Sequence, residues 1–195
     1  MTAANVDDLA DELGAQGEVV LALAYLELRW SEMAALRASD VDLARRRVRV
    51  VQRATEVRGK IDLAAPKSRA SARHVAIPGM LVDLLMARTV GRPADALVFP
   101  APDGGYLRNG NWKRQVKWAD VTKSLGLEGI TPHDLRRTYG SLARLAGADL
   151  RFIQKAMGHE SITTTARIYA YLYDDELDAI AEAMNALRAP QGGLT

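Results

Sequence analysis

The stretch that decides the fold opens with TPHDLR at residues 131–136. Thr131 can cap a helix, and Asp134 takes the acidic position of a capping box three residues later. A helix that begins there places His133 and Arg136 three residues apart, so both side chains lie on one helix face. The sequence therefore predicts a helix that presents an imidazole and a guanidinium side by side.

The residues that follow predict two more short helices. Residues 149–157 have helical spacing, and Gly158 can end that helix in a left-handed conformation. His159 is then expected in the turn. Ser161 can cap a third helix that runs to Tyr169. The segment as a whole gathers two imidazoles, a cation and a phenol, which suits chemistry on an anion such as phosphate.

Apolar residues indicate how the first of these helices is oriented. Leu135, Leu142 and Leu145 are expected on its buried side.

Composition narrows the class of protein. The chain has 195 residues, 48% of them hydrophobic, which is enough for one domain with a sizeable core. It has no Cys, so disulfides, thiolate metal sites and a Cys nucleophile are excluded. The His spacing does not match a metal motif, and no metal site is expected. The longest apolar run, residues 19–26, is too short to span a membrane, and no secretory signal precedes it. A cytoplasmic protein is expected.

The charge is small overall, at +2, but unevenly distributed. Acidic residues gather at both ends of the chain, while residues 45–73 and 108–123 are strongly basic. Basic segments between acidic ends predict a positive face that contacts DNA phosphates without reading sequence. The alternative is an ordinary solvated surface of mixed charge. The residues expected on the DNA-binding face are Arg45, Arg47, Arg49, Arg69, Arg73, Lys113, Arg114 and Lys117.

Periodicity elsewhere predicts an α+β fold that is mostly helical, with a small three-stranded antiparallel sheet at one edge. The sheet is expected as a meander whose second hairpin carries Lys67 at its tip. Its strands are expected at residues 47–51, 61–63 and 73–77. Further helices are expected at residues 6–28, interrupted at Gly14 and Gly17, and at 31–37, 79–88 and 109–125.

Six features in one order resemble the catalytic domain of tyrosine recombinases, and most closely the integrases of temperate phages. They are Arg29 with Glu32, Lys67 in a strand turn, His133-x-x-Arg136, Gly158-His159 and Tyr169. The resemblance covers residues 6–185. It implies the tyrosine-recombinase catalytic fold and site-specific DNA recombination.

The resemblance also implies a role for each residue. Arg29 and Arg136 would hold the scissile phosphate, and Lys67 would protonate the leaving 5′ oxygen. His133 and His159 would donate hydrogen bonds or relay protons. Tyr169 would attack and form a 3′-phosphotyrosyl link, with Tyr171 and Tyr173 as rivals. The chemistry needs no cofactor.

Two features depart from the family pattern. Leu26-Glu27 stands where the family usually has Thr-Gly, and a carboxylate there could shift Arg29 or disturb a phosphate site. The chain is also expected to be a single catalytic domain, 1–195, with its core at about 6–172 and no N-terminal DNA-binding domain. An acidic helix at 174–188 is expected to contact a neighbouring recombinase protomer on the attachment-site DNA, or to fold back on its own core.

Three hypotheses follow. The first is a DNA strand transferase. The second is a catalytically impaired fragment that only binds DNA or a partner recombinase, as Glu27 would suggest. The third is an enzyme that relaxes supercoils by the same chemistry without a specific site.

Overall fold

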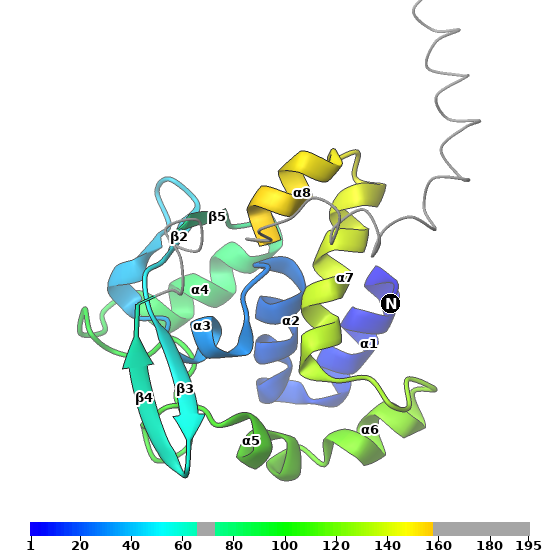
Figure 1. The fold of residues 1–195 in the computed structure, drawn as a ribbon, viewed down its shortest axis with the longest axis horizontal. Helices are drawn as coiled ribbons and strands as arrows, with labels where there is room; N and C mark the ends of the chain where they lie inside the picture. Colours follow the sequence, from blue (N-terminus) through cyan, green and yellow to red (C-terminus); the bar gives the residue numbers. More distant parts are fainter. Residues whose placement is uncertain (66–72, 158–195) are drawn as a thin grey trace, which may run out of the picture.

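Helices account for about half of the residues described by the computed structural model, which are 1–65 and 73–157 (Figure 1). The α-helices are α1 (Ala3–Glu12), α2 (Gly17–Tyr25), α3 (Trp30–Ala34), α4 (Val82–Thr89), α5 (Asn109–Gln115), α6 (Trp118–Ser124), α7 (Pro132–Leu145) and α8 (Leu150–Met157). The strands are β1 (Val41–Asp42), β2 (Arg47–Val50), β3 (Arg53–Val57), β4 (Lys60–Ala64) and β5 (Arg73–Ala76). The predicted α+β class, mostly helical with a small antiparallel sheet, is confirmed.

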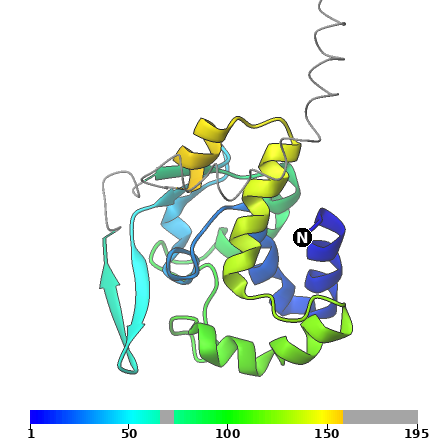
Figure 2. The same cartoon turned by 45° about the vertical axis from the view of Figure 1, so that its right-hand side comes forward.

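Helix α2 lies at the centre of the core, and both α1 and α7 pack on it (Figures 1 and 2). Val20, Leu23 and Ala24 are fully buried on α2, as its apolar sequence predicts. A Cβ on Gly17 would lie 2.0 Å from the carbonyl oxygen of Ala10, so α1 and α2 can approach this closely only with glycine at that position.

The predicted helix over residues 6–28 ends earlier than expected. Helix α2 stops at Tyr25, and Glu27 has a φ of 48°, in the left-handed region. An α-helix cannot continue through such a residue. The chain therefore leaves the helix before Arg29 rather than carrying that arginine on it.

The sheet has three strands as predicted, but they are not the three strands that were expected. The three-stranded sheet has the order β1-β2-β5, and β1 lies outside the three strands that were expected. Strands β3 and β4 form a separate two-stranded hairpin, which Figure 1 shows extending from the rest of the fold. Its turn has positive φ at Arg58 and Gly59, typical of the tight two-residue turn that joins adjacent strands. The segment between β4 and β5, which includes Lys67, therefore joins two different sheets.

The predicted helix over 109–125 is divided into α5 and α6. The break falls at Lys117, whose φ of 50° ends one helix and starts the next. Trp30, Trp112 and Trp118 stack across this region, with ring centroids 5.2 and 5.3 Å apart along the series. Trp112 is fully buried, and its indole N–H donates to Gln16 at 2.9 Å. The stack ties the α5–α6 layer to the N-terminal helices.

Helix α7 begins as predicted. The backbone N–H and hydroxyl of Thr131 donate to the Asp134 carboxylate at 2.9 and 2.7 Å. Leu135 is fully buried, but Leu145 is 73% exposed, so its expected place on the buried side was wrong. Helix α8 packs on Tyr139 and Ala143 instead and leaves Leu145 outside that contact. In the part of the chain that the structure describes, no helix is long and apolar enough to cross a membrane.

Candidate active site

Arg29 lies at the start of α3, directly after the apolar segment that leaves α2. Its backbone N–H donates to Glu32 Oε2 and its Nη1 donates to Glu32 Oε1, both at 2.9 Å. Glu32 is buried, whereas the Arg29 side chain is 37% exposed. The carboxylate of Glu32 therefore holds Arg29 by its backbone and side chain, and part of the guanidinium remains accessible.

Arg136 comes to the same place from α7. It is 2% exposed, and it donates from Nη1 to the carbonyl oxygen of Glu27 and from Nη2 to that of Met157. Arg29 Nη2 lies 3.5 Å from the same Met157 oxygen. The structure thus brings together two guanidiniums that are far apart in the sequence, on one shared acceptor.

The charge on these arginines is set by burial and by each other. Burial and the neighbouring positive Arg29 lower the pKa of Arg136 to about 10, so it stays protonated at neutral pH. Burial opposes ionisation of Glu32, but hydrogen bonds from Arg73 and Arg29 outweigh it and keep its pKa below the usual value. The site thus combines a protonated Arg136 with a firmly ionised Glu32 carboxylate.

Glu27 makes the turn that leads to Arg29. The residue adopts the left-handed conformation that glycine would favour, and its carboxylate receives Arg73 Nε at 2.7 Å. Its carbonyl oxygen accepts from Arg136. The backbone therefore makes the turn that precedes Arg29 without glycine, at a cost of about 1 kcal/mol or more in conformational energy.

Arg73 occupies a different position from the one expected of a DNA-contacting residue. Its side chain is 8% exposed, and its guanidinium lies between the carboxylates of Glu27 and Glu32. The alternation of strand β5 explains the change, because Arg73 and the buried Val75 lie on one face of the strand while exposed His74 lies on the other. Sequence reasoning missed this role because it depends on Glu27, which is remote in the sequence.

His133 is exposed at the start of α7 and borders a cavity that Arg29 also lines. The cavity has a volume of about 340 Å³ and lies between the β3–β4 hairpin and the start of α5. Partial burial of His133, together with the positive charges of Arg137 and Arg136, lowers its pKa. A neutral imidazole is therefore favoured near neutral pH, beside an arginine that can bind an anion.

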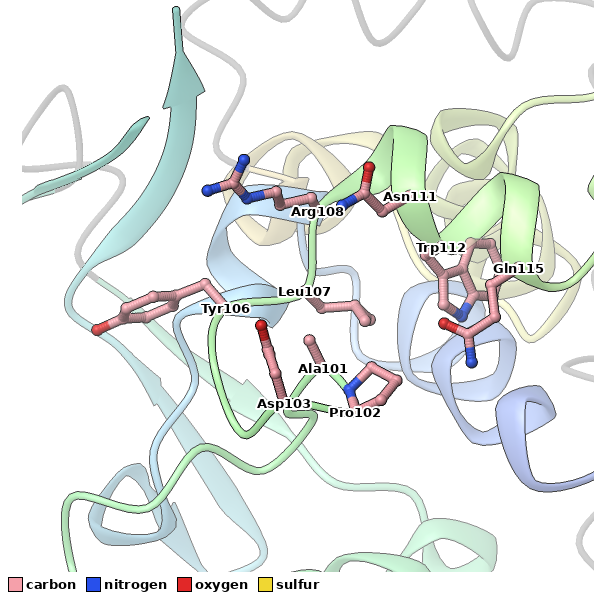
Figure 3. Close-up of a pocket in the computed structure, with 9 residues that line it drawn as sticks. All are labelled: Ala101, Pro102, Asp103, Tyr106, Leu107, Arg108, Asn111, Trp112 and Gln115. Atoms are coloured by element: carbon pink, nitrogen blue, oxygen red, sulfur yellow. The ribbon is translucent and has the colours of Figure 1, made fainter. Parts of the chain in front are cut away.

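A second cavity, of about 240 Å³, adjoins the first (Figure 3). Figure 3 shows its wall formed by the loop before α5 and by that helix, with Trp112 and Gln115 on one side and Tyr106 on the other. Leu107 and Arg108 line both cavities. Arg29, His133 and Arg136, the predicted catalytic residues that the structure describes, do not line this second cavity.

Six other basic residues predicted to contact DNA fall in the described part of the chain, and they are exposed or half-buried. Arg45, Arg47 and Arg49 are exposed on and before β2. Two of them also pair with acids: Arg45 with Asp42 and Arg49 with Asp40, each at 3.1 Å. The basic residues of the α5 region that are exposed or half-buried are Lys113, Arg114 and Lys117.

Four predicted site residues fall outside the described part of the chain. They are Lys67, Arg69, His159 and Tyr169. The acidic segment at 174–188 also lies outside it. The roles expected of these residues stay predictions.

A family model described as "Phage integrase family" matches residues 2–176. The chain belongs to that family. It is similar to the tyrosine recombinase XerD of Rickettsia bellii, with 32% identity over 177 residues that cover 87% of this chain and 56% of the relative. It is also similar to the tyrosine recombinase XerC of Roseiflexus castenholzii, with 33% identity over 145 residues, 74% of this chain and 43% of the relative. The chain spans about half the length of these curated relatives.

Solved structures of an integrase and a recombinase agree with the fold. The Tn1549 transposon integrase, solved in complex with transposon right end DNA, matches with a TM-score of 0.76 and 20% identity, over 95% of this chain and 65% of that one. The XerA recombinase matches with a TM-score of 0.67 and 25% identity, over 98% and 64% of the two chains. The predicted tyrosine-recombinase catalytic fold is confirmed.

Proposed function

We propose that this chain is the catalytic part of a tyrosine recombinase that cuts and rejoins DNA at a specific site. The observation that carries the proposal is the meeting of Arg29 and Arg136 on one acceptor, beside a cavity bordered by His133. Two guanidiniums that converge from separate segments suit the two non-bridging oxygens of a phosphodiester.

The chemistry follows from the charge that develops during the reaction. Negative charge grows on the non-bridging oxygens as a nucleophile adds to phosphorus, and fixed cations nearby stabilise it. Arg136 remains protonated because its pKa, about 10, lies well above neutral pH. Arg29 is held by Glu32 but is partly exposed, so it can also contact the DNA.

The remaining roles rest on position in the sequence. Tyr169 attacks the phosphate and forms a 3′-phosphotyrosyl link. Lys67 protonates the leaving 5′ oxygen as general acid, and His133 and His159 donate hydrogen bonds. The 5′ hydroxyl of a second strand then attacks the link and reseals the DNA.

The proposal extends to the partners of the protein. Its substrate is double-stranded DNA that carries an attachment site, and other recombinase protomers bind the same DNA. Arg45, Arg47, Arg49, Arg69, Lys113, Arg114 and Lys117 contact the backbone phosphates. The acidic residues 174–188 contact a neighbouring protomer. Because the substrate is chromosomal or phage DNA, we expect the protein to act in the cytoplasm.

The test is covalent capture on DNA. The protein is incubated with a library of nicked duplexes whose arms are randomised, and protein-linked DNA is recovered under denaturing conditions. We expect wild-type protein to form an adduct that Tyr169→Phe loses. Tyr171→Phe and Tyr173→Phe are the matched controls, and both should retain it.

Two results would contradict the proposal in different ways. Specific DNA binding without any adduct, even at high protein concentration, would make the chain a module that binds but does not cut. Relaxation of supercoiled DNA with no preference for any recovered sequence would indicate a topoisomerase-like enzyme instead.

A further inference from the structure

Glu27 is a buried acid in an unusual place. It is 2% exposed, has a φ of 48°, and lies two residues before Arg29. A left-handed glutamate costs conformational energy, and a buried carboxylate costs desolvation energy. The folded protein tolerates both costs only where the surrounding contacts outweigh them, so the carboxylate needs a strong partner.

That partner is Arg73, whose guanidinium donates hydrogen bonds to two acids. Its Nε donates to Glu27 Oε1 at 2.7 Å and its Nη2 to the Glu27 carbonyl oxygen at 3.2 Å. Its Nη1 and Nη2 also donate to the two carboxylate oxygens of Glu32, at 3.2 and 3.1 Å. A rigid planar fork thus connects strand β5 to the turn after α2 and to α3.

Two of the groups that accept from Arg73 also contact an arginine of the candidate site. The Glu27 carbonyl oxygen also accepts from Arg136. The Glu32 carboxylate also accepts from Arg29 at 2.9 Å and lies 3.9 Å from Arg136. A shift of Arg73 would therefore move the groups that hold both of the other guanidiniums.

The charges of the cluster also suit a site that binds an anion. Three guanidiniums, from Arg29, Arg73 and Arg136, face the two carboxylates of Glu27 and Glu32. The cluster keeps a net positive charge, which a phosphate could neutralise. Glu27 and Arg73 together add no net charge when both are ionised, so the pair can orient its neighbours without weakening the attraction for an anion.

We propose that Glu27 and Arg73 are a mutually dependent pair of positioning residues that hold Arg29 and Arg136 in the geometry needed for phosphate chemistry, although neither touches DNA. The proposal rests on the proposed function of the same site. It assigns Arg73 to the site rather than to the DNA-binding face, and it explains how this chain can carry glutamate where the family pattern has glycine.

The test separates positioning from folding and from DNA binding. Arg73→Lys keeps the charge but loses the planar fork, and the double variant Glu27→Gln/Arg73→Gln removes both buried charges together. Single-turnover cleavage at saturating protein and DNA affinity are measured separately on the DNA recovered by covalent capture. We expect both variants to cleave at least tenfold more slowly while their affinity for DNA changes less than threefold.

The matched control is Arg88→Gln. It breaks the Arg88–Glu18 ion pair, which lies on α4 and α2 away from the two arginines. This variant should cleave as fast as wild type. If the double variant folds, as its circular dichroism would show, and cleaves within threefold of the wild-type rate, the positioning role is refuted. A loss that appears only as weaker DNA binding would also refute it.

A second readout does not depend on activity. The ¹⁵Nε resonance of Arg136, assigned with Arg136→Lys, reports the environment of its guanidinium. We expect it to shift in Arg73→Lys and to stay in place in Arg88→Gln. If wild-type protein formed no adduct, the proposed function would fail, while an unshifted Arg136 resonance would overturn the positioning role by itself.

Discussion

Arg136 illustrates what a single buried residue contributes to the site. Both of its terminal nitrogens donate to carbonyl oxygens, and its charge is only partly compensated by Glu32 at 3.9 Å. Arg137, the next residue, is exposed and pairs with Asp134. Variants of these two neighbouring arginines can therefore distinguish a proposed catalytic role from the effect of positive charge on α7 in general.

The first prediction follows from that pair. Arg136→Lys should slow cleavage by roughly 100-fold or more, because it removes one fixed donor to the developing charge. Arg137→Gln should leave the cleavage rate within threefold of wild type. Single-turnover assays on the captured DNA provide the measurement. Equal losses of cleavage rate in the two variants would show that the position of an arginine on α7 does not matter.

Glu27 gives a second prediction, on pH. Burial raises the pKa of its carboxyl to about 7, despite the opposing charges of Arg73 and Arg136 and with a further upward effect of Glu32. Burial, followed by the negative charge of Glu27, raises the pKa of Tyr139 on α7. Between pH of about 4.5 and 7 the folded state then holds a proton that the unfolded state releases. The free energy of unfolding should therefore fall as pH rises through that window.

Urea unfolding of wild type and Glu27→Gln at pH 5 and pH 8 tests this. The wild type should lose roughly 1–3 kcal/mol more than the variant between the two pH values, since one pKa unit corresponds to about 1.4 kcal/mol. Glu32 does not confuse the comparison. Its lowered pKa places its own contribution below pH of about 4.5, where stability is lost as pH falls. An equal change in the free energy of unfolding for the two proteins between pH 5 and pH 8 would contradict the prediction.

At the scale of elements, close packing of α1 on α2 positions the segment that carries Arg29. The backbone of Ala10 occupies the space that a Cβ on Gly17 would need. Helix α2 in turn contacts α7, which carries Arg136. A disturbance at this contact should therefore reduce the stability of the whole core.

Gly17→Ala should lower the free energy of unfolding by about 2–3 kcal/mol, because the contacted atoms are backbone and cannot move aside cheaply. Gly110→Ala is the matched control. It lies on α5 with nothing within 4 Å of its Cβ position, so it should be neutral or slightly stabilising. Chemical denaturation of both variants provides the measurement. A Gly17→Ala protein as stable as wild type would mean that the helices can separate without cost.

At the scale of the whole molecule, exposed basic residues on and before β2 are proposed to bind DNA through its charge. Each phosphate contact releases counterions, so the logarithm of affinity falls with the logarithm of salt concentration by about 0.9 per contact. Arg45→Gln/Arg47→Gln should reduce the magnitude of that slope by about 2, whatever the DNA sequence. Fluorescence anisotropy with labelled duplex DNA at several salt concentrations measures it.

Arg92→Gln is the control for this measurement. Arg92 is exposed but lies outside the segments proposed to contact DNA, so the slope should stay unchanged. An equal reduction in slope for the Arg92 variant and the double variant would mean that DNA affinity depends on the net charge of the protein alone. The proposed DNA-binding face would then have no support from Arg45 and Arg47.

Much of the local structure could be predicted from the sequence, because its causes are local. Thr131 and Asp134 predict where α7 begins, since a capping pair acts within one helical turn. Six features in one order, from Arg29 to Tyr169, indicated the family. Local patterns were wrong where backbone conformation was unusual: Glu27 and Lys117 have positive φ, which neither residue type favours.

The sequence by itself determined the kind of fold, the start of its key helix and the set of candidate catalytic residues. Only the tertiary structure decided that Arg29 and Arg136 meet at Met157, and that Arg73 lies between Glu27 and Glu32 instead of at the surface. The reason is physical. A buried charge is stable only beside compensating charges, and those come from α3, α7, β5 and the turn after α2, which no local pattern brings together.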